Sequence, residues 1–191
     1  MARGPRVILG LVGGPGSGKS TLAAALHAAF PEESVVVPMD GYHLANSELA
    51  RLGRAGRKGA PDTFDSAGYV ALLQRLRQQA PDEVVYAPEY RREIEEGIAG
   101  AIAVRPDTRL VITEGNYLLL PTGHWASVAP LLHEAWFVEV DPALRRERLV
   151  RRHMQFGRSQ AEAVAWVAAT DEPNAQLIDE HKARAQHTFC W

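Results

Sequence analysis

The 191-residue sequence contains one cysteine, Cys190, and no apolar run that approaches the roughly 20 residues a membrane-spanning helix needs. A single cysteine excludes an intrachain disulfide, and it favours a reducing cytoplasm as the location. Residues 1–6 lead directly into the first predicted strand, so we expect no signal peptide. The net charge of −2 gives no reason to expect a nucleic acid or a membrane as partner.

The remaining composition is typical of a globular α/β protein. Hydrophobic residues make up 46% and charged residues 23% of the chain, and 191 residues suffice for one domain with a full core. Apolar strand-like segments alternate with helical ones, which predicts a mostly parallel sheet covered on both faces. We therefore expect one three-layer α/β domain over residues 1–191.

A glycine-rich stretch near the start fits the phosphate-binding pattern G-x-x-x-x-G-K-[ST] at every fixed position. An apolar strand is predicted before it at 7–12, and an Ala- and Leu-rich helix after it at 21–30. This context disfavours a chance glycine turn and predicts a P-loop NTPase fold. The expected nucleotide-binding residues are Gly13, Gly14, Pro15, Gly16, Ser17, Gly18, Lys19, Ser20 and Thr21. Lys19 is expected to reach the β- and γ-phosphates, and the Ser20 hydroxyl to ligate Mg²⁺.

Hydrophobic spacing places the other elements. Further strands are predicted at 34–39, 84–88, 110–113, 134–140 and 188–191. Further helices are predicted at 44–52, 66–79, 125–132, from 142 up to Gly157, at 160–169 and at 174–186. Residues 51–59 form a predicted loop that is a candidate mobile segment over the site, and residues 89–93 are predicted to be charged and exposed.

Two acidic residues follow core strands. Asp40 comes after the strand at 34–39, and Glu114 after the strand at 110–113. Ligands of open α/β sheets bind at the carboxyl ends of strands, so both are expected beside the P-loop. Asp40 is the candidate base for an acceptor hydroxyl, and Glu114 the candidate metal-coupled acid. The alternatives are that Asp40 only caps a turn and that Glu114 is an ordinary carboxylate at the end of a strand. His43 is interpreted as structural.

Arginines form a third group of candidates. Arg148, Arg151 and Arg158 surround the helix break at Gly157, which predicts a small lid at roughly 148–160. A lid arginine can neutralise charge on a transferred phosphoryl group. The alternative is that these arginines only form a solvated face of the helix. Arg145 is assigned to a different face of that helix. Tyr90, with Arg91 and Arg92, is interpreted either as an acceptor contact or as part of an exposed loop.

With these residues placed, nearly the whole chain resembles the uridine kinase, phosphoribulokinase and bacterial pantothenate kinase family of P-loop small-molecule kinases. The matching segments are the P-loop, Asp40-Gly41-Tyr42, Glu114-Gly115-Asn116, and Arg148-x-x-Arg151 followed by Gly157-Arg158. The resemblance implies that Asp40 is the catalytic base and that the lid arginines contact ATP phosphates. Among family members, the chain is most similar to compact bacterial uridine kinase-like proteins and kinases of fructose uptake systems.

The chain departs from the uridine kinase pattern where that family binds its acceptor. Gly59 stands at the position of an aspartate that binds ribose hydroxyls, and the segment beginning at Lys58 is closer to pantothenate kinases. Tyr90 matches the uridine kinase pattern, but Glu95 stands near the position of a downstream histidine. The expected acceptor-binding residues are Asp40, Tyr42, Lys58, Tyr90 and Arg91.

These features predict an ATP- and Mg²⁺-dependent kinase that phosphorylates a hydroxyl of a small metabolite. A nucleoside is the leading acceptor, and a sugar or a pantothenate-like alcohol is the alternative. A nucleotide-dependent switch or ATPase is a second hypothesis, although the guanine-reading Asn-Lys-x-Asp motif is missing from the sequence. The sequence leaves open whether the chain forms a homodimer.

Overall fold

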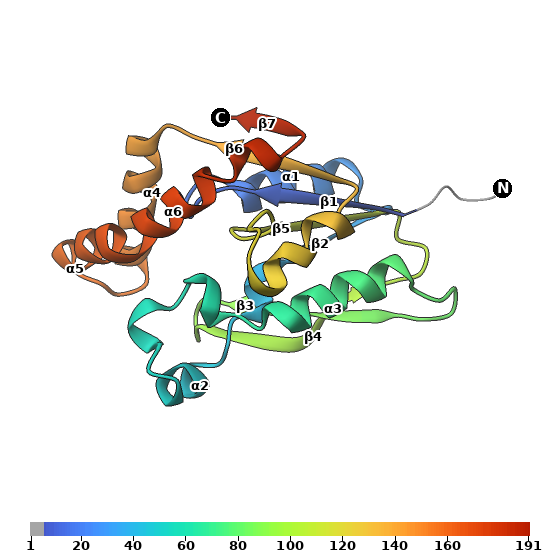
Figure 1. The fold of residues 1–191 in the computed structure, drawn as a ribbon, viewed down its shortest axis with the longest axis horizontal. Helices are drawn as coiled ribbons and strands as arrows, with labels where there is room; N and C mark the ends of the chain where they lie inside the picture. Colours follow the sequence, from blue (N-terminus) through green and yellow to red (C-terminus); the bar gives the residue numbers. More distant parts are fainter. Residues whose placement is uncertain (1–5) are drawn as a thin grey trace.

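A five-stranded parallel sheet forms the centre of the protein, whose residues 6–191 are described by a computed structural model (Figure 1). Its strand order is β2-β5-β1-β6-β7, and every neighbouring pair is parallel. The strands are β1 (Val7–Val12), β2 (Ser34–Pro38), β5 (Leu110–Gly115), β6 (Glu134–Glu139) and β7 (His187–Cys190). The predicted parallel sheet is thus confirmed, including the short last strand.

Helices cover both faces of this sheet because its strands are apolar on both sides. On β1, Ile8 and Val12 belong to a core cluster that includes α3 (Ser66–Arg77), whereas Leu9 and Leu11 pack in a second cluster with α1 (Lys19–Ala29). Alternating side chains on a strand point to opposite faces, so β1 contributes to both clusters. The three-layer α/β architecture predicted from the sequence is confirmed.

A separate antiparallel hairpin corrects the sequence prediction for the middle of the chain. β3 (Val85–Arg91) extends past the strand predicted at 84–88 and pairs with β4 (Glu96–Val104), which the sequence analysis did not predict. β4 is mostly exposed and has only Val104 buried, so it lacks the regular alternation of a half-buried strand. The hairpin lies below the main sheet beside α3 (Figure 1).

The helical segments also differ in detail from the prediction. Residues 125–132 form short 3₁₀ turns at Gly123–Ser127 and Ala129–Leu131 instead of one helix. The C-terminal half contains α4 (Pro142–Gln155), α5 (Gln160–Trp166) and α6 (Glu172–Asp179), and a π-helical turn at Val167–Asp171 joins the last two. Asp141 caps α4 through Ala143 and Leu144, as its position before Pro142 predicts.

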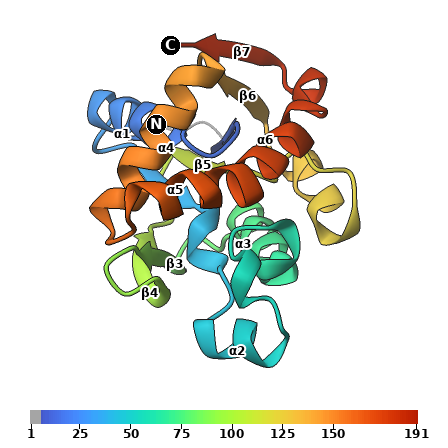
Figure 2. The same cartoon turned by 90° about the vertical axis from the view of Figure 1, so that its left-hand side faces the viewer.

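The carboxyl ends of the central strands point toward one end of the molecule, which Figure 2 views directly. There α4, α5 and α6 lie on one side, and α2 (Asn46–Arg51) and the β3–β4 hairpin lie on the other. None of the helices within residues 6–191 combines the length and the apolar character that a bilayer crossing requires.

Candidate active site

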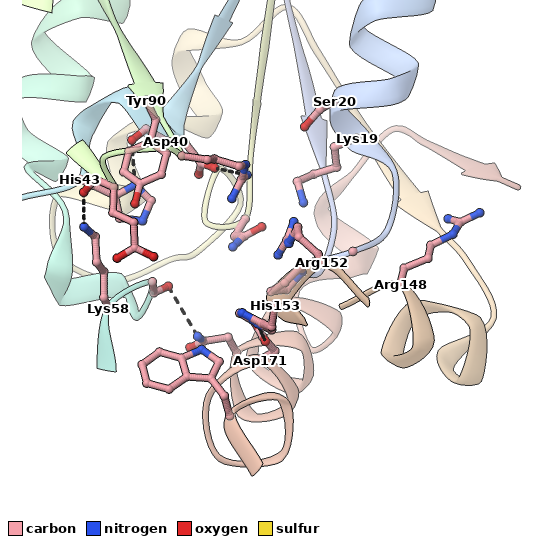
Figure 3. Close-up of a pocket in the computed structure, with 18 of the residues that line it drawn as sticks. Lys19, Ser20, Asp40, His43, Lys58, Tyr90, Arg148, Arg152, His153 and Asp171 are labelled. Atoms are coloured by element: carbon pink, nitrogen blue, oxygen red, sulfur yellow. Dashed lines mark hydrogen bonds and ion pairs between the residues drawn. The ribbon is translucent and has the colours of Figure 1, made fainter. Parts of the chain in front are cut away.

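A polar cavity of about 670 Å³ opens at this end of the sheet (Figure 3). Lys19 and Ser20 lie on one side of it, and Asp40, His43, Lys58 and Tyr90 lie on the opposite side. The other lining residues are Pro15, Gly16, Gly18, Thr21, Asn46, Ala55, Gly59, Phe64, Arg92, Glu95, Glu114, Asn116, Arg148, Arg152, His153, Arg158, Trp166, Asp171, Asn174 and Trp191. Gly13, Gly14 and Ser17 complete the P-loop without lining the cavity.

The P-loop owes its shape to glycines in left-handed conformations. Gly16 has φ +79° and Gly18 has φ +94°, values that residues with a Cβ rarely adopt. A Cβ on Gly16 would approach Leu149 of α4 to 2.9 Å, and one on Gly18 would lie 2.6 Å from the indole nitrogen of Trp191. The loop is therefore packed against α4 and against Trp191. The sequence analysis missed the contact with Trp191.

Lys19 is buried, with 7% of its surface exposed. Its ammonium donates to the carbonyls of Gly13 at 2.9 Å and Gly14 at 3.0 Å. Burial lowers the pKa of Lys19, and the nearby Glu114 and Asp40 carboxylates oppose that shift. A buried cation at the start of a helix, beside a glycine loop that exposes its backbone, suits a polyphosphate ligand.

Ser20 and Glu114 meet at the base of the cavity. The Ser20 hydroxyl donates to Glu114 Oε1 at 2.9 Å. Within residues 6–191, no group of three or more His, Cys, Asp or Glu side chains is arranged to hold a metal ion alone. One hydroxyl and one carboxylate are nevertheless the oxygen donors that fit Mg²⁺, which takes its other ligands from phosphates and water. This donor set fits the predicted metal ion.

Burial raises the pKa of Glu114, and the Asp40 carboxylate raises it further because Pro38 of β2 pairs with Glu114 of β5 and brings Asp40 close. When the pKa of a carboxyl group is higher in the folded than in the unfolded protein, ionisation of that group favours the unfolded protein. The group therefore destabilises the fold once the pH rises above its unfolded-state pKa. Glu114→Gln is therefore expected to raise the melting temperature of the ligand-free protein at pH 7 by a few degrees, since about 1 kcal/mol corresponds to ~2–4 °C at this size.

The same substitution should lower Mg²⁺-dependent turnover by about 100-fold, because it removes a charged oxygen donor. Thermal melts at pH 7 and pH 4 supply the internal control, since protonation of Glu114 at the lower pH should remove the difference between the two proteins. Equal melting temperatures of the native protein and the Glu114→Gln variant at pH 7 would contradict the view that burial raises the pKa of Glu114.

Asp40 lies on a 3₁₀ turn, Met39–Tyr42, directly after β2. Its Oδ2 is 3.3 Å from Nη2 of Arg92, which comes from the turn between β3 and β4. Arg91, the predicted acceptor contact, instead lies outside the cavity and pairs with Glu89 at 2.7 Å. Neighbouring residues near the end of a strand point to different sides, so the hairpin turns Arg92 and not Arg91 toward Asp40.

The arginines of α4 are divided in a similar way. Arg148 and Arg152 line the cavity, whereas Arg151 is exposed and pairs with Glu147 at 2.6 Å. Positions three and four apart can both share a helix face with Arg148, so spacing alone does not choose between Arg151 and Arg152; the orientation of α4 turns Arg152 to the cavity. Burial lowers the pKa of Arg152, and the neighbouring Arg92 lowers it further. Arg158 also lines the cavity, with its guanidinium 3.8 Å from the centre of the Trp166 ring.

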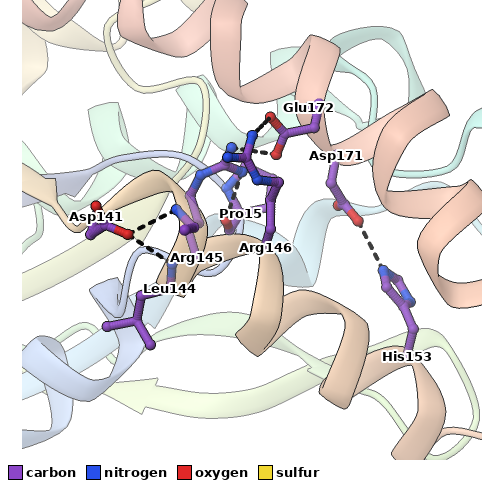
Figure 4. Close-up of polar contacts among 9 residues, drawn as sticks. Pro15, Asp141, Leu144, Arg145, Arg146, His153, Asp171 and Glu172 are labelled. Atoms are coloured by element: carbon purple, nitrogen blue, oxygen red, sulfur yellow. Dashed lines mark hydrogen bonds and ion pairs between the residues drawn. The ribbon is translucent and has the colours of Figure 1, made fainter. Parts of the chain in front are cut away.

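Two contacts connect α4 to the π-helical turn and to α6 (Figure 4). Nε2 of His153 lies 2.9 Å from Asp171 Oδ2 in the cavity wall. Arg145 is buried and forms an ion pair with Glu172. Its Nη1 lies 3.5 Å from the Pro15 carbonyl oxygen, so the side chain supports the P-loop. π-Helical turns often mark functional sites, but no sequence pattern predicted this one.

The side of the cavity around Tyr90 is a candidate acceptor site. His43 packs between Phe64 and Tyr90, with ring centroids 4.0 and 4.6 Å away, and its Nδ1 donates to the Asp40 carbonyl at 2.7 Å. Burial lowers the pKa of His43, which agrees with its interpretation as a structural residue. Tyr42 does not line the cavity and instead packs edge-on against Tyr69, so its position does not support the predicted contact with the acceptor.

Comparison with known proteins adds independent evidence. No protein-family model matches the chain. A Schizosaccharomyces pombe protein named "putative uridine kinase" is 35% identical over 92% of this chain and 79% of its own length. An Aspergillus versicolor "ATP-dependent kinase-like protein" is 38% identical over 78% of this chain and 91% of its own length. The crystal structure of a "putative fructose transport system kinase" from Silicibacter sp. TM1040 superposes with a TM-score of 0.89 at 38% identity, covering 98% of this chain and 91% of that one.

Proposed function

The chain belongs to the uridine kinase-like family of P-loop kinases, and from this premise we propose that it transfers the γ-phosphate of ATP to a hydroxyl of a small metabolite. The observation that carries the proposal is the convergence of Lys19, Asp40, Glu114 and Arg152 on one cavity. A phosphoryl transfer requires a phosphate cradle, charge neutralisation and a group that orients the acceptor hydroxyl. Each of these requirements has a candidate in the cavity wall.

Each residue has a defined task in this proposal. Residues 13–21 bind the ATP phosphates, and Lys19 turns from the loop carbonyls toward the β- and γ-phosphates. When bound between Ser20, Glu114 and ATP, Mg²⁺ would supply neutralisation of phosphate charge. Asp40 orients the acceptor hydroxyl and accepts its proton. Arg148, Arg152 and Arg158 belong to the lid at roughly 148–160, which closes over the phosphates.

The acceptor is the finer part of the proposal. A nucleoside is the leading acceptor from the sequence resemblance, and a sugar or a pantothenate-like alcohol is the alternative. The name of the Silicibacter protein supports a sugar to the same extent as the name of the fission yeast protein supports a nucleoside. The cytoplasmic location and a homodimer stay predictions.

ADP release with and without an acceptor tests the proposal. The purified protein with Mg·ATP should hydrolyse ATP slowly, and one class among nucleosides, hexoses, pentoses and pantothenate should accelerate ADP release at least about tenfold, because the acceptor completes the site. Mass spectrometry should then detect the phosphorylated acceptor. Hydrolysis that only a macromolecular partner accelerates, without a phosphorylated small molecule, would instead favour a nucleotide-dependent switch.

A further inference from the structure

The arginines from α4 to the start of α5 divide into two groups by their partners. Some pair with carboxylates: Arg145 and Arg146 with Glu172, and Arg151 with Glu147. Three others line the cavity, and within residues 6–191 their guanidinium groups form no hydrogen bond or ion pair: Arg148, Arg152 and Arg158. A guanidinium carries five N–H donors and no acceptor, so these three side chains are free to bind an anion.

The backbone around Arg158 is fixed by the ends of two helices. Gly157 has φ +97°, and the Arg158 N–H donates to the His153 carbonyl at 3.2 Å, which closes the last turn of α4. Ser159 then begins α5 with a capping box that includes Glu162. Arg158 therefore lies between two capped helices, and only its long side chain needs further support.

The ring of Trp166 supplies that support. Trp166 is half-buried, ends α5 and lines the cavity, and the centre of its ring is 3.8 Å from the guanidinium carbon of Arg158. This is van der Waals contact, so the guanidinium lies along the face of the ring and does not point an N–H into it. Such stacking leaves the in-plane N–H donors free for a two-point hydrogen bond to phosphate. The ring can therefore hold Arg158 without competing with a phosphate ligand.

Two further contacts hold Trp166 itself. The ring of His153 meets the Trp166 ring near its edge, with the two centroids 6.3 Å apart and the planes at 62°. His153 Nε2 lies 2.9 Å from Asp171 Oδ2 (Figure 4), and both of these side chains are largely buried. A continuous set of contacts thus runs from Arg158 through Trp166 and His153 to the π-helical turn.

We propose that Trp166 is a positioning residue that holds Arg158 toward the ATP phosphates, and that His153 and Asp171 keep the Trp166 ring in place. This role rests on the proposed kinase function. An unsupported arginine loses rotamer freedom when it binds a phosphate, whereas an arginine stacked on a ring has already lost part of that freedom. Trp166 touches no reacting atom in this arrangement and acts through Arg158.

A double-mutant cycle between Trp166 and Arg158 tests this role. Arg158→Gln should weaken ATP binding by about tenfold and lower kcat/KM for ATP by about 100-fold, because it removes a cation from the phosphates. Trp166→Leu should weaken ATP binding by about threefold and lower kcat/KM by about tenfold, because it removes the stacking partner. The double variant should be no worse than Arg158→Gln alone, since Trp166 has no effect without Arg158. Trp166→Phe keeps an aromatic face and should hold kcat/KM within about threefold of the native value.

Val164→Ala is the matched control, because Val164 lies on α5, is exposed and does not line the cavity. It should keep native ATP affinity and turnover, and a thermal melt of each variant verifies that it is folded. Losses that multiply in the double variant would show that Trp166 acts independently of Arg158 and would overturn the assignment. Native values for Trp166→Leu or for Arg158→Gln would overturn it as well. If no acceptor is phosphorylated, the kinase function fails, but equilibrium titration with ATP needs no acceptor and still decides the role of Trp166.

Discussion

Asp40→Asn is expected to lower kcat by about 10²- to 10⁴-fold, the range typical of removing a general base. Asparagine keeps the size of the side chain but cannot accept the acceptor's proton. The affinity for ATP should change little, since the residues proposed to bind the nucleotide phosphates, 13–21, lie on the opposite side of the cavity from Asp40. ADP release with the best acceptor and equilibrium titration with ATP measure the two effects separately.

Asp62→Asn provides the control for this experiment. Asp62 pairs with Arg54 and Arg57 at the surface and does not line the cavity. Surface ion pairs contribute little to stability, so this variant should keep turnover within about twofold of the native protein. An Asp40→Asn protein that retains more than roughly a tenth of native kcat would show that Asp40 is not the base.

Arg152→Gln should lower kcat/KM by about 10²- to 10³-fold, because a cation preorganised in a cavity stabilises charge on the phosphoryl group far better than water does. Arg152 is half-buried and lines the cavity together with Asp40, Glu114 and Arg92. Its removal should act on kcat more than on the KM for ATP, since the charge that it neutralises grows during the transfer. Steady-state kinetics at several ATP concentrations separate these parameters.

Arg151→Gln is the adjacent comparison, and it distinguishes the structural assignment from the one made on the sequence. Arg151 is exposed and pairs with Glu147 on the solvent side of α4, so its loss should change turnover by less than about twofold. If Arg151→Gln were the more damaging of the two variants, the functional side of α4 would differ from the side that lines the cavity.

Local sequence determined the half of the candidate site around the P-loop. Strand, loop and helix from 7 to 30 are contiguous, and only glycine suits the left-handed positions at Gly16 and Gly18. Asp40 and Glu114 could also be predicted, because Asp40 follows β2, Glu114 lies near the end of β5, and the carboxyl ends of parallel strands meet at one edge. For these residues, position along the chain largely fixes position in space.

The tertiary structure decided the other half. The choice of Arg92 over Arg91 and of Arg152 over Arg151 depends on which side of a strand or helix faces the cavity, and charge patterns alone cannot show this. β4 was missed because its side chains are mostly exposed and carry no periodic signal, so the turn holding Glu95 had no predicted place. Contacts between segments distant in sequence, such as Lys58 with Glu95, hold that turn at the cavity. The chain alone therefore determined the P-loop and the acidic residues at the strand ends, and only the fold decided which arginines line the cavity with them.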